Sequence, residues 1–403
     1  MRLLYYADGR SPIARSWIEH FVQAGHEVHW VSSFAAAAIP GLASFQVVPV
    51  AFSVPASNRA AAPAVGRARG LQLRLAVRQW LGPLTVGSAA SSLRPIVETI
   101  HPDLVHALRI PFEGMVAARA SSGFPLLVSV WGNDFTLHAQ ASPGMSLLTG
   151  RTLHRAAGLH ADCRRDLGLA SRWGFPEGRP SIVLPGSGGI RPSVFFPAGE
   201  RDEVISVRMR AFFGSLPNGA RLVVNPRGFR AYVRNDTFFR AVPLVLRRLA
   251  NVVFVCPSMA GESQAERWRR RVDPASSVRL LPALDPGEMA TLFRRAQVSV
   301  SPSTHDGTPN TLLEAMACGC FPIAGDLESV REWLVRGETG LIVNPGDNEG
   351  LAWAIIRALE DDPLRQSAAQ RNVQVTRQRA DYATCMQQAE DFYRAVMQAG
   401  PVL

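Results

Sequence analysis

A twice-repeated alternation of short apolar runs with helical stretches is the feature that most constrains the fold of this chain. In the first part, the strand-like runs are Leu3–Ala7, Glu27–Ser32, Asp103–Ala107, Leu126–Val130 and Gly158–Ala161. In the second part, they are Arg221–Val224, Val252–Cys256, Val278–Leu281, Val298–Ser301, Phe321–Ala324 and Gly340–Val343. Such alternation is typical of βαβ units, in which helices cover both faces of a parallel sheet.

A glycine-rich stretch, residues 184–190, separates the two alternating blocks and is followed by Pro192 and Pro197. We interpret it as a linker between domains. The sequence therefore predicts an α/β protein with two doubly wound, Rossmann-like domains that face a cleft, over residues 1–188 and 189–378. A helix at Asp381–Gln398, within the tail 379–403, is expected to pack back on the first domain.

The basic residues of the chain are all arginine: the sequence has 43 Lys plus Arg and contains no Lys. This excludes lysine chemistry such as a Schiff base, pyridoxal phosphate attachment or a P-loop lysine. Arginine remains charged and binds phosphate through two parallel hydrogen bonds. The net charge of +10 suits an anionic partner, but it does not by itself distinguish a nucleotide, a nucleic acid or an anionic lipid.

The apolar runs are short, and none approaches the roughly 18 residues of a membrane span. The N-terminus lacks the pattern of a signal peptide, so we expect a cytoplasmic protein. The 5 cysteines suggest no disulfide framework. Cys318 and Cys320 lack the further ligands of a metal site, and we interpret them as small residues in a turn.

Residues 54–95 are rich in Ala, Gly, Pro and Arg. A helix at Arg69–Leu81 would place apolar and basic side chains on different faces: Leu73, Val77 and Trp80 on one, and Arg74 and Arg78 on another. Such a helix could rest on anionic lipid at the inner face of the membrane. The alternative is an ordinary surface helix with its apolar side on the core.

The segment Ser301–Ala317, SPSTHDGTPNTLLEAMA, carries the most specific chemistry. It starts at the end of a strand, passes through a turn shaped by Gly307 and Pro309, and enters a helix. The backbone N–H groups near Thr308–Leu312 would form an anion site at the helix N-terminus, suited to a diphosphate. Glu314 could reach the ribose hydroxyls beside that phosphate.

This segment resembles the paired-carboxylate motif of retaining GT-B glycosyltransferases, especially glycosyltransferase family four. The resemblance implies that Glu314 holds the ribose of a nucleotide-sugar and that Asp306 lies near the transferred sugar. The loop between them, with Gly307, Thr308, Pro309, Asn310, Thr311 and Leu312, would bind the diphosphate and the sugar hydroxyls. Asp306 stands where the family has Glu, one methylene longer.

Arginines after the first strand of the second domain extend the resemblance. In the family an Arg and a Lys clamp the donor pyrophosphate, because the leaving diphosphate gains negative charge as the glycosidic bond breaks. Arg227 matches the first of these. Arg234 is our match for the second, and Arg230 is its rival.

The first domain resembles the family more loosely. Ser11 follows the first strand, and His106 ends a later one. Trp131, Asn133 and Asp134 lie in a WGND turn, where many relatives have a histidine near the reacting sugar. Asp134 is a candidate catalytic residue and the other four are candidate acceptor contacts, but a structural turn at residues 131–134 and a core histidine at 106 remain alternatives.

The sequence thus predicts a retaining hexosyltransferase that moves a sugar from a nucleoside-diphosphate sugar to a hydroxyl acceptor. The resemblance favours UDP over GDP, and a role in bacterial polysaccharide, glycolipid or glycoconjugate synthesis. No Asp-x-Asp triplet is present, and we expect no metal, no further cofactor and no nucleic-acid partner. The alternatives are a nucleotide-sugar epimerase of the same fold and an inactive, donor-binding partner subunit.

Overall fold

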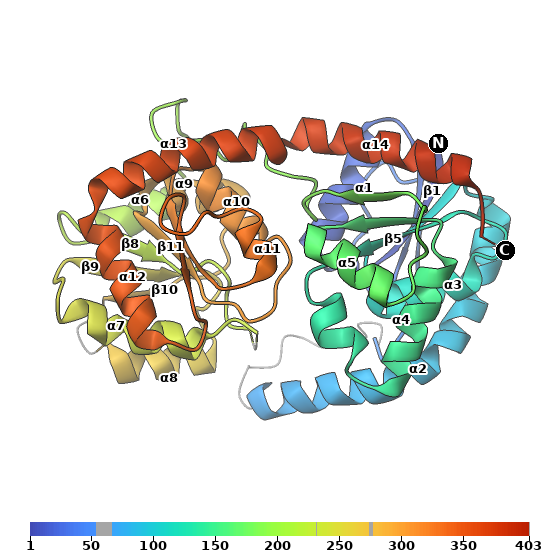
Figure 1. Cartoon of the computed structure of the whole chain (residues 1–403), viewed down its shortest axis with the longest axis horizontal. Coiled ribbons are helices and arrows are strands. Elements are labelled where there is room, and N and C mark those ends of the chain that lie inside the picture. Colours follow the sequence, from blue (N-terminus) through green and yellow to red (C-terminus); the bar gives the residue numbers. More distant parts are fainter. Residues whose placement is uncertain (54–66, 231, 274–276, 403) are drawn as a thin grey trace. The chain divides into compact units, whose positions relative to one another are not determined.

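The computed structural model describes residues 1–53, 67–230, 232–273 and 277–402, which form two compact units (Figure 1). The first unit comprises Met1–Gly189 with Ala383–Leu403, and the second comprises Ile190–Tyr382. From the sequence we expected domain borders after residues 188 and 378, and in the structure the borders fall after residues 189 and 382. The tail helix is thus assigned to the first unit.

The first unit contains a seven-stranded parallel sheet of order β3-β2-β1-β4-β5-β6-β7. Its strands are β1 (Arg2–Ala7), β2 (Glu27–Ser32), β3 (Ser44–Val47), β4 (Leu104–Ala107), β5 (Leu126–Val130), β6 (Gly158–Ala161) and β7 (Ser181–Val183). Its helices are α1 (Pro12–Gln23), α2 (Arg67–Ile100), α3 (Met115–Ala120), α4 (Pro143–Arg155), α5 (Arg164–Arg172) and α14 (Tyr382–Ala399), with π-type turns at Ile110–Gly114 and Asp134–Ala139.

Alternation along β1 sends its side chains to the two faces of this sheet. Leu4 and Tyr6 join an apolar cluster with buried residues of α2, α3 and α4. Tyr5 points to the opposite face, where its ring packs 6.1 Å from that of Phe21 in α1. Both faces of the sheet are therefore covered by helices.

Tyr393 joins α14 to this second face. Its hydroxyl accepts from Trp17 Nε1 at 2.8 Å, lies 3.1 Å from the Tyr5 hydroxyl and hydrogen-bonds His106 Nδ1. The other ring nitrogen of His106 bonds Ser129 Oγ at 2.8 Å. These polar atoms are buried, so each depends on its neighbours for a partner.

The second unit contains a six-stranded parallel sheet of order β10-β9-β8-β11-β12-β13. Its strands are β8 (Arg221–Val224), β9 (Val252–Cys256), β10 (Val278–Leu280), β11 (Val298–Ser301), β12 (Phe321–Gly325) and β13 (Leu341–Val343). Its helices are α6 (Val207–Gly214), α7 (Asn235–Leu246), α8 (Ser263–Val272), α9 (Pro286–Arg295), α10 (Asn310–Ala317), α11 (Glu328–Arg331), α12 (Asn348–Glu360) and α13 (Asp362–Arg379). The expectation of two doubly wound α/β domains is confirmed.

Two strands escaped the sequence analysis, and both lie at an edge of the first sheet. The side chains of β3 are partly or fully exposed, and so are those of β7. An edge strand with little burial has no apolar run to reveal it. The basic segment 54–95 falls partly outside the described residues, which resume at Arg67. Among the described helices, none has the length and apolar character needed to cross a membrane.

We expect Tyr393→Phe to destabilise the first unit by about 1–3 kcal/mol, because it leaves the buried Trp17 and His106 donor and acceptor atoms without a partner. Urea unfolding followed by tryptophan fluorescence measures this. Arg394→Gln, on the exposed face of the same helix, should change the free energy of unfolding by only a few tenths of a kcal/mol. Equal effects of the two substitutions would contradict the assignment.

Candidate functional site

The carboxyl ends of β8 and β11 define the candidate site of the second unit. The chain leaves β8 toward β9 and β10 on one side and returns to β11 on the other, so the strand order reverses between β8 and β11. Ligands of doubly wound proteins bind at such a reversal, just outside the carboxyl ends of the strands. Arg227 follows β8, and the loop 302–309 follows β11.

A buried ion pair connects these two strand ends. Arg227 Nη2 donates to Asp306 Oδ2 at 2.6 Å, and the two side chains are 11% and 15% exposed. Burial raises the pKa of Asp306, and the charges of Arg227 and Arg230 oppose that rise. Arg227 Nε is buried with no hydrogen-bond partner among the described residues, so it can still donate to a ligand.

The loop between Asp306 and α10 is tightly held. Thr308 is 5% exposed and accepts from Trp333 Nε1 at 2.9 Å. Ser329 Oγ donates to the carbonyl oxygen of Asp306 at 2.9 Å. At Gly325, the end of β12, an added Cβ would lie 2.3 Å from the Ser303 carbonyl oxygen, so only glycine allows this approach. The backbone at the start of α10 is therefore fixed in advance of any ligand.

Helix α10 begins at Asn310, and Pro309 occupies its N-cap position. Leu312 and Leu313 are buried and fix the helix on the sheet, whereas the hydroxyl of Thr311 is buried with no partner in the described part of the chain. Gly307 is also buried. The first amides of α10 thus follow the loop that the Arg227–Asp306 pair holds, and a helix N-terminus of this kind suits an anion.

Glu314 is the unpaired acid of this site. Its carboxylate makes no hydrogen bond to any described residue, and only the charge of Arg227 favours its ionised form. Burial raises the pKa of Glu314 to about 7, against that charge. A perturbed carboxyl group beside a helix N-terminus is a sign of a functional position rather than of a structural ion pair.

The structure does not place Arg234 beside Asp306. Its guanidinium forms two hydrogen bonds of 2.8 Å to Asp236, and it is 36% exposed. Arg230 donates to the Tyr232 hydroxyl at 2.9 Å, and its charge acts on Asp306. Of the two candidates for the second cation, the rival Arg230 is the one whose charge acts on Asp306.

In the first unit, the structure corrects the expectation for Asp134. Asp134 is 1% exposed. Its carboxylate accepts from Arg109 Nη2 at 2.6 Å and from the Ile110 and Trp131 amides at 3.3 and 3.2 Å. A carboxylate so enclosed has no surface for a substrate, so Asp134 holds the loop and Arg109 rather than reacting.

His106 is corrected in the same way, whereas the acceptor contact of Ser11 stays a prediction. His106 is 1% exposed with both ring nitrogens bonded, and burial lowers its pKa well below the usual value, so it is a neutral core residue. Ser11 caps α1 by accepting from the Ala14 amide at 3.3 Å. Asn133 and Trp131 remain partly exposed, with Asn133 Oδ1 accepting from Arg109 at 3.3 Å and the Trp131 ring 5.9 Å from the Arg109 guanidinium carbon.

Arg109 is the residue of this region that the sequence analysis missed. It follows β4, at the reversal of strand order between β1 and β4. An arginine directly after a buried strand was the available signal, as for Arg227 after β8. Its partner Asp134 could not be assigned from the sequence, because the pairing depends on how β4 and β5 align.

The described residues contain one group that could hold a metal: Asp162, Cys163 and Asp166, whose ligand atoms lie within 4.8 Å of one another. Arg165 already donates to Asp166 at 2.8 Å. Burial raises the pKa of the Cys163 thiol far above its usual value, so the thiolate that a metal needs is disfavoured. These residues do not fit a metal site.

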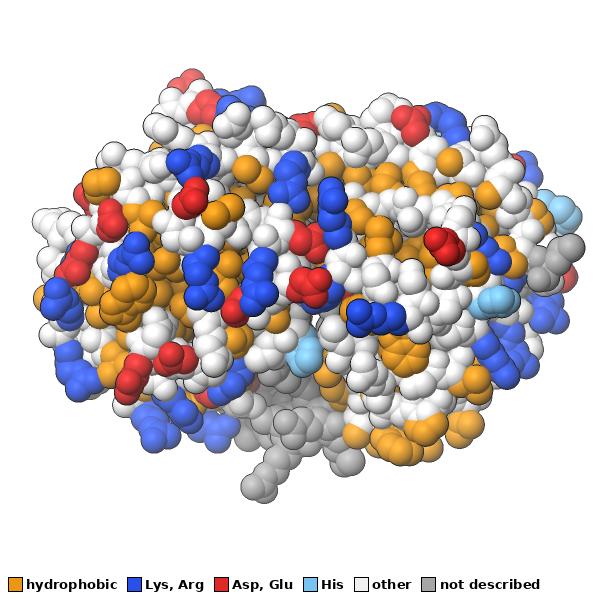
Figure 2. Space-filling view, viewed as in Figure 1, with side chains coloured by type: hydrophobic (Ala, Val, Ile, Leu, Met, Phe, Trp, Pro, Cys, Tyr) orange, Lys and Arg blue, Asp and Glu red, His pale blue; other side chains and the backbone are white. Residues whose placement is uncertain are grey.

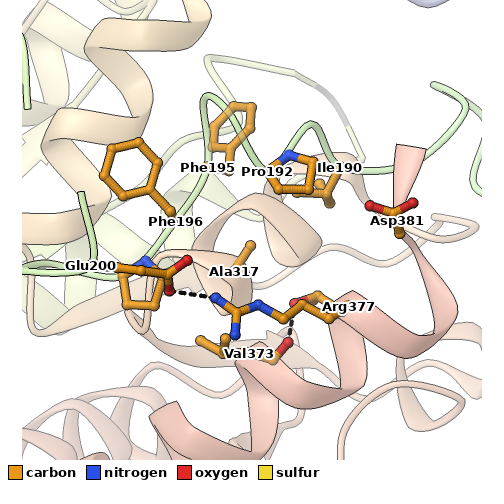
Figure 3. A pocket seen from close by; sticks show the side chains of 11 residues that line it. Ile190, Pro192, Phe195, Phe196, Glu200, Ala317, Val373, Arg377 and Asp381 are labelled. Carbon is orange, nitrogen blue, oxygen red and sulfur yellow. Dashed lines mark hydrogen bonds and ion pairs between the residues drawn. The ribbon is translucent and has the colours of Figure 1, made fainter. Parts of the chain in front are cut away.

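A separate cavity in the second unit lies at the opposite end of α10, near Ala317 (Figure 3). Phe195, Phe196 and Pro192 line it from the segment after the linker, and Arg377 lines it from α13, paired with Glu200. The apolar lining packs the linker against α13. It is therefore not part of the site at the N-terminus of α10.

The fold of the chain is similar to those of solved proteins. Over nearly its whole length the fold is that of GT-B glycosyltransferases. It is similar to sucrose-phosphate synthase from Thermosynechococcus elongatus, with a TM-score of 0.75, 16% identity and coverage of 99% of this chain and 100% of that one. It is also similar to Anabaena HepE, solved in complex with UDP and glucose, with a TM-score of 0.72, 16% identity and coverage of 97% and 98%.

Sequence families agree with the fold. The family described as "Glycosyl transferase 4-like domain" matches residues 8–186, and "Glycosyl transferases group 1" matches residues 228–361. The chain belongs to this glycosyltransferase family, as its motifs suggested.

Curated relatives match over shorter stretches. The phosphatidyl-myo-inositol mannosyltransferase of Mycolicibacterium smegmatis is 31% identical over 164 residues, which is 40% of this chain and 41% of that protein. A Mycobacterium tuberculosis glycogen synthase is 34% identical over 128 residues, 30% of each chain. The matches thus span well under half of these relatives.

We expect Glu314→Gln to stabilise the protein at pH 8 by on the order of 1–3 kcal/mol more than at pH 5. With its pKa raised to about 7, the folded state keeps a proton that the unfolded state releases, so wild-type stability falls as pH rises from the ordinary carboxyl range toward 7. Glutamine has no such cost. Urea unfolding at both pH values measures the difference. Glu338→Gln, which is exposed, should show none.

Proposed function

We propose that this chain transfers a sugar from a nucleoside-diphosphate sugar to a hydroxyl acceptor. The observation that carries the proposal is the group formed by Arg227, Asp306 and Glu314 with the first turn of α10, at the strand-order reversal of the second sheet. The buried cation and the helix N-terminus suit the diphosphate of such a donor. The unpaired carboxylate suits its ribose.

Each group has a separable role in this proposal. Glu314, ionised, accepts hydrogen bonds from the ribose hydroxyls. The amides at the start of α10 and Arg227 Nε bind the diphosphate, with Arg230 as the second cation. Asp306 faces the sugar, and its ion pair with Arg227 fixes its position. Arg234 can bind the diphosphate only if its ion pair with Asp236 breaks.

The reaction that follows is retaining and independent of metal. The glycosidic C–O bond breaks as negative charge accumulates on the leaving diphosphate, which the arginines and α10 amides stabilise. The acceptor hydroxyl attacks from the same face, and its proton passes to a phosphate oxygen. No strong protein base is needed, which agrees with the withdrawal of Asp134 and His106 into the interior.

The HepE structure supports a uridine nucleotide, and the curated relatives support a biosynthetic role. HepE binds UDP and glucose, and other relatives are a phosphatidyl-myo-inositol mannosyltransferase and an O-antigen chain mannosyltransferase. We therefore propose a UDP-sugar donor and a place in polysaccharide, glycolipid or glycoconjugate synthesis, in the cytoplasm.

Nucleotide binding tests the donor site. We expect UDP to bind more tightly than GDP or ADP in calorimetry at pH 8, and Glu314→Gln to weaken UDP binding about tenfold or more, since a charged hydrogen-bond acceptor is lost. Glu338→Gln is the matched control. Indifference of the wild type to every nucleotide would reject the proposal.

Turnover distinguishes the rival functions. Nucleotide binding without product from any donor–acceptor pair would indicate an inactive partner subunit. A sugar altered at C2 without an acceptor would indicate an epimerase. For a transferase, the anomeric configuration of the product by NMR should equal that of the donor.

We also propose that α2 contacts the membrane surface. It exposes large apolar side chains, which gather over this helix in Figure 2: Leu75, Val77, Trp80, Leu81 and Leu84 are 37%, 40%, 62%, 47% and 79% exposed. The net charge of +10 adds attraction to anionic lipid. Phe52, 55% exposed, precedes it in the chain.

Vesicle binding tests this contact. The full chain should co-sediment with vesicles that contain phosphatidylglycerol, and the double substitution Trp80→Ser/Leu84→Ser should reduce the bound fraction severalfold, because apolar burial is lost. Trp353→Ser, at an exposed tryptophan of the second unit, is the control. Equal binding of wild type and double variant would return α2 to the ordinary surface-helix interpretation.

A further inference from the structure

A second pocket lies at the reversal of strand order in the first sheet, between the ends of β1 and β4. Its volume is about 90 Å³, which is room for a small group such as a phosphate and less than the roughly 300–1,000 Å³ of a site for a whole small molecule. Polar side chains dominate its lining: Asp8, Arg78, Gln79, Arg109, Glu113 and His138. The same topological rule that marks the donor site therefore marks a site here.

The backbone on one side of this pocket is strained. Arg109 has φ 137° and Phe112 has φ 69°, both in the region that favours glycine. Such conformations cost on the order of 1–3 kcal/mol each and persist only where the surroundings enforce them. Asp134 does so, by accepting from the Ile110 amide and from the Arg109 guanidinium. The fold thus maintains a costly arrangement that aims Arg109, 27% exposed, at the pocket.

Arg78 enters from α2 on the other side. Its guanidinium carbon lies 4.8 Å from the ring centre of Phe112 and 5.2 Å from that of Phe34. Gly82, one turn later, lets the helix approach, because an added Cβ would lie 2.6 Å from the Phe112 ring. Arg78 forms no ion pair with a described residue, and its Nε is buried without a hydrogen-bond partner.

Glu113, in the turn Ile110–Gly114, lines the pocket as well. It is 1% exposed, its Oε1 accepts from Ser33 Oγ at 2.5 Å, and its Oε2 has no partner within the described part of the chain. Burial raises the pKa of this carboxyl group. A fully buried, unsatisfied oxygen that lines a cavity is costly without a ligand.

The other charged groups of the pocket leave Arg78 without an ion pair to any described residue. Burial, with the charges of Arg109 and Arg78, lowers the pKa of His138 to about 3, so this ring is neutral. Asp8 is held by two hydrogen bonds from Arg10, at 3.0 and 2.8 Å. Asp134 occupies one nitrogen of Arg109 and leaves its Nε without a partner. Arg78 is therefore the guanidinium of this pocket that forms no ion pair with a described residue, although the charge of Glu113 acts on it.

We propose that this pocket binds an oxyanion, a phosphate or carboxylate group, carried by the acceptor. Arg78 supplies its free N–H groups and Arg109 supplies Nε, while Oε2 of Glu113 lines the same pocket without a partner among the described residues. The stacked rings hold the Arg78 fork in one plane, which suits two parallel hydrogen bonds to a planar or tetrahedral anion. The inference rests on the proposed function in one respect: the transfer reaction is the reason for assigning the oxyanion to the acceptor.

Calorimetry with the full chain tests the pocket without any nucleotide. Inorganic phosphate should bind, and glucose 6-phosphate should bind more tightly than glucose. Arg78→Gln should weaken both phosphate ligands at least about tenfold, since charged hydrogen bonds are lost. Arg94→Gln, the same change at an exposed position of α2, should leave them unaltered. Equal phosphate affinity in these two variants would overturn the proposal.

Glu113→Gln separates an anion from a neutral polyol. Glutamine keeps an acceptor for Ser33 and removes the negative charge, so an anion pocket should bind phosphate more tightly in this variant. A pocket for sugar hydroxyls would instead lose its acceptor, Oε2, and bind glucose more weakly with no gain for phosphate; that result rejects the proposal. A thermal unfolding midpoint close to that of the wild type shows that the variant is folded.

Two further arms identify the source of the anion and its relation to the donor. If the ligand is soluble, Arg78→Gln should lower the binding of glucose 6-phosphate. If the ligand is a lipid headgroup, the same variant should lower binding to vesicles with phosphatidic acid, relative to phosphatidylcholine. If Arg78→Gln lowers neither, the proposal is overturned. UDP affinity should be equal in wild type and Arg78→Gln. If the wild type binds phosphate through Arg78 but no nucleotide, the proposed transferase function fails while the anion pocket stands.

Discussion

The buried ion pair between Arg227 and Asp306 is the interaction on which the second unit's site depends. It joins residues 79 positions apart in the sequence and ties the end of β8 to the loop after β11. Two charges withdrawn from water are tolerable only together, because loss of one leaves the other uncompensated, at a cost of about 3–5 kcal/mol. The pair therefore fixes the loop that leads into α10, and with it the direction of the helix amides and the position of Glu314.

The first unit repeats this construction with different residues. Arg109 follows β4 and pairs at 2.6 Å with Asp134, which follows β5. In both units an arginine just past a buried parallel strand is neutralised by an aspartate from the loop of a neighbouring strand. Parallel sheets favour this solution, because the carboxyl ends of adjacent strands deliver their loops to one edge. Each pair then leaves a different group of its site without a partner.

The sequence predicted the parts of this molecule that local patterns control. Val252–Cys256 is a continuous apolar run and Leu126–Val130 is apolar except at Ser129, and both are completely buried strands. The turn before α10 was visible from Gly307 and Pro309, so the order of Asp306, helix start and Glu314 could be derived. The edge strands β3 and β7 were not visible, since burial does not constrain their side chains.

Pairings across the sheet lay beyond sequence reasoning. Asp134 had the appearance of a catalytic acid because it ends an apolar run, yet its role follows from Arg109, 25 positions earlier. His106 likewise lies at a strand end, but its contact with Tyr393, 287 positions away, makes it part of the core. Arg234, which we expected to bind the diphosphate, instead forms an ion pair with Asp236, two residues later in the sequence. What remains unpaired after these contacts decides the chemistry: a carboxylate, Glu314, at one sheet, suited to hydroxyls, and a guanidinium, Arg78, at the other, suited to an anion.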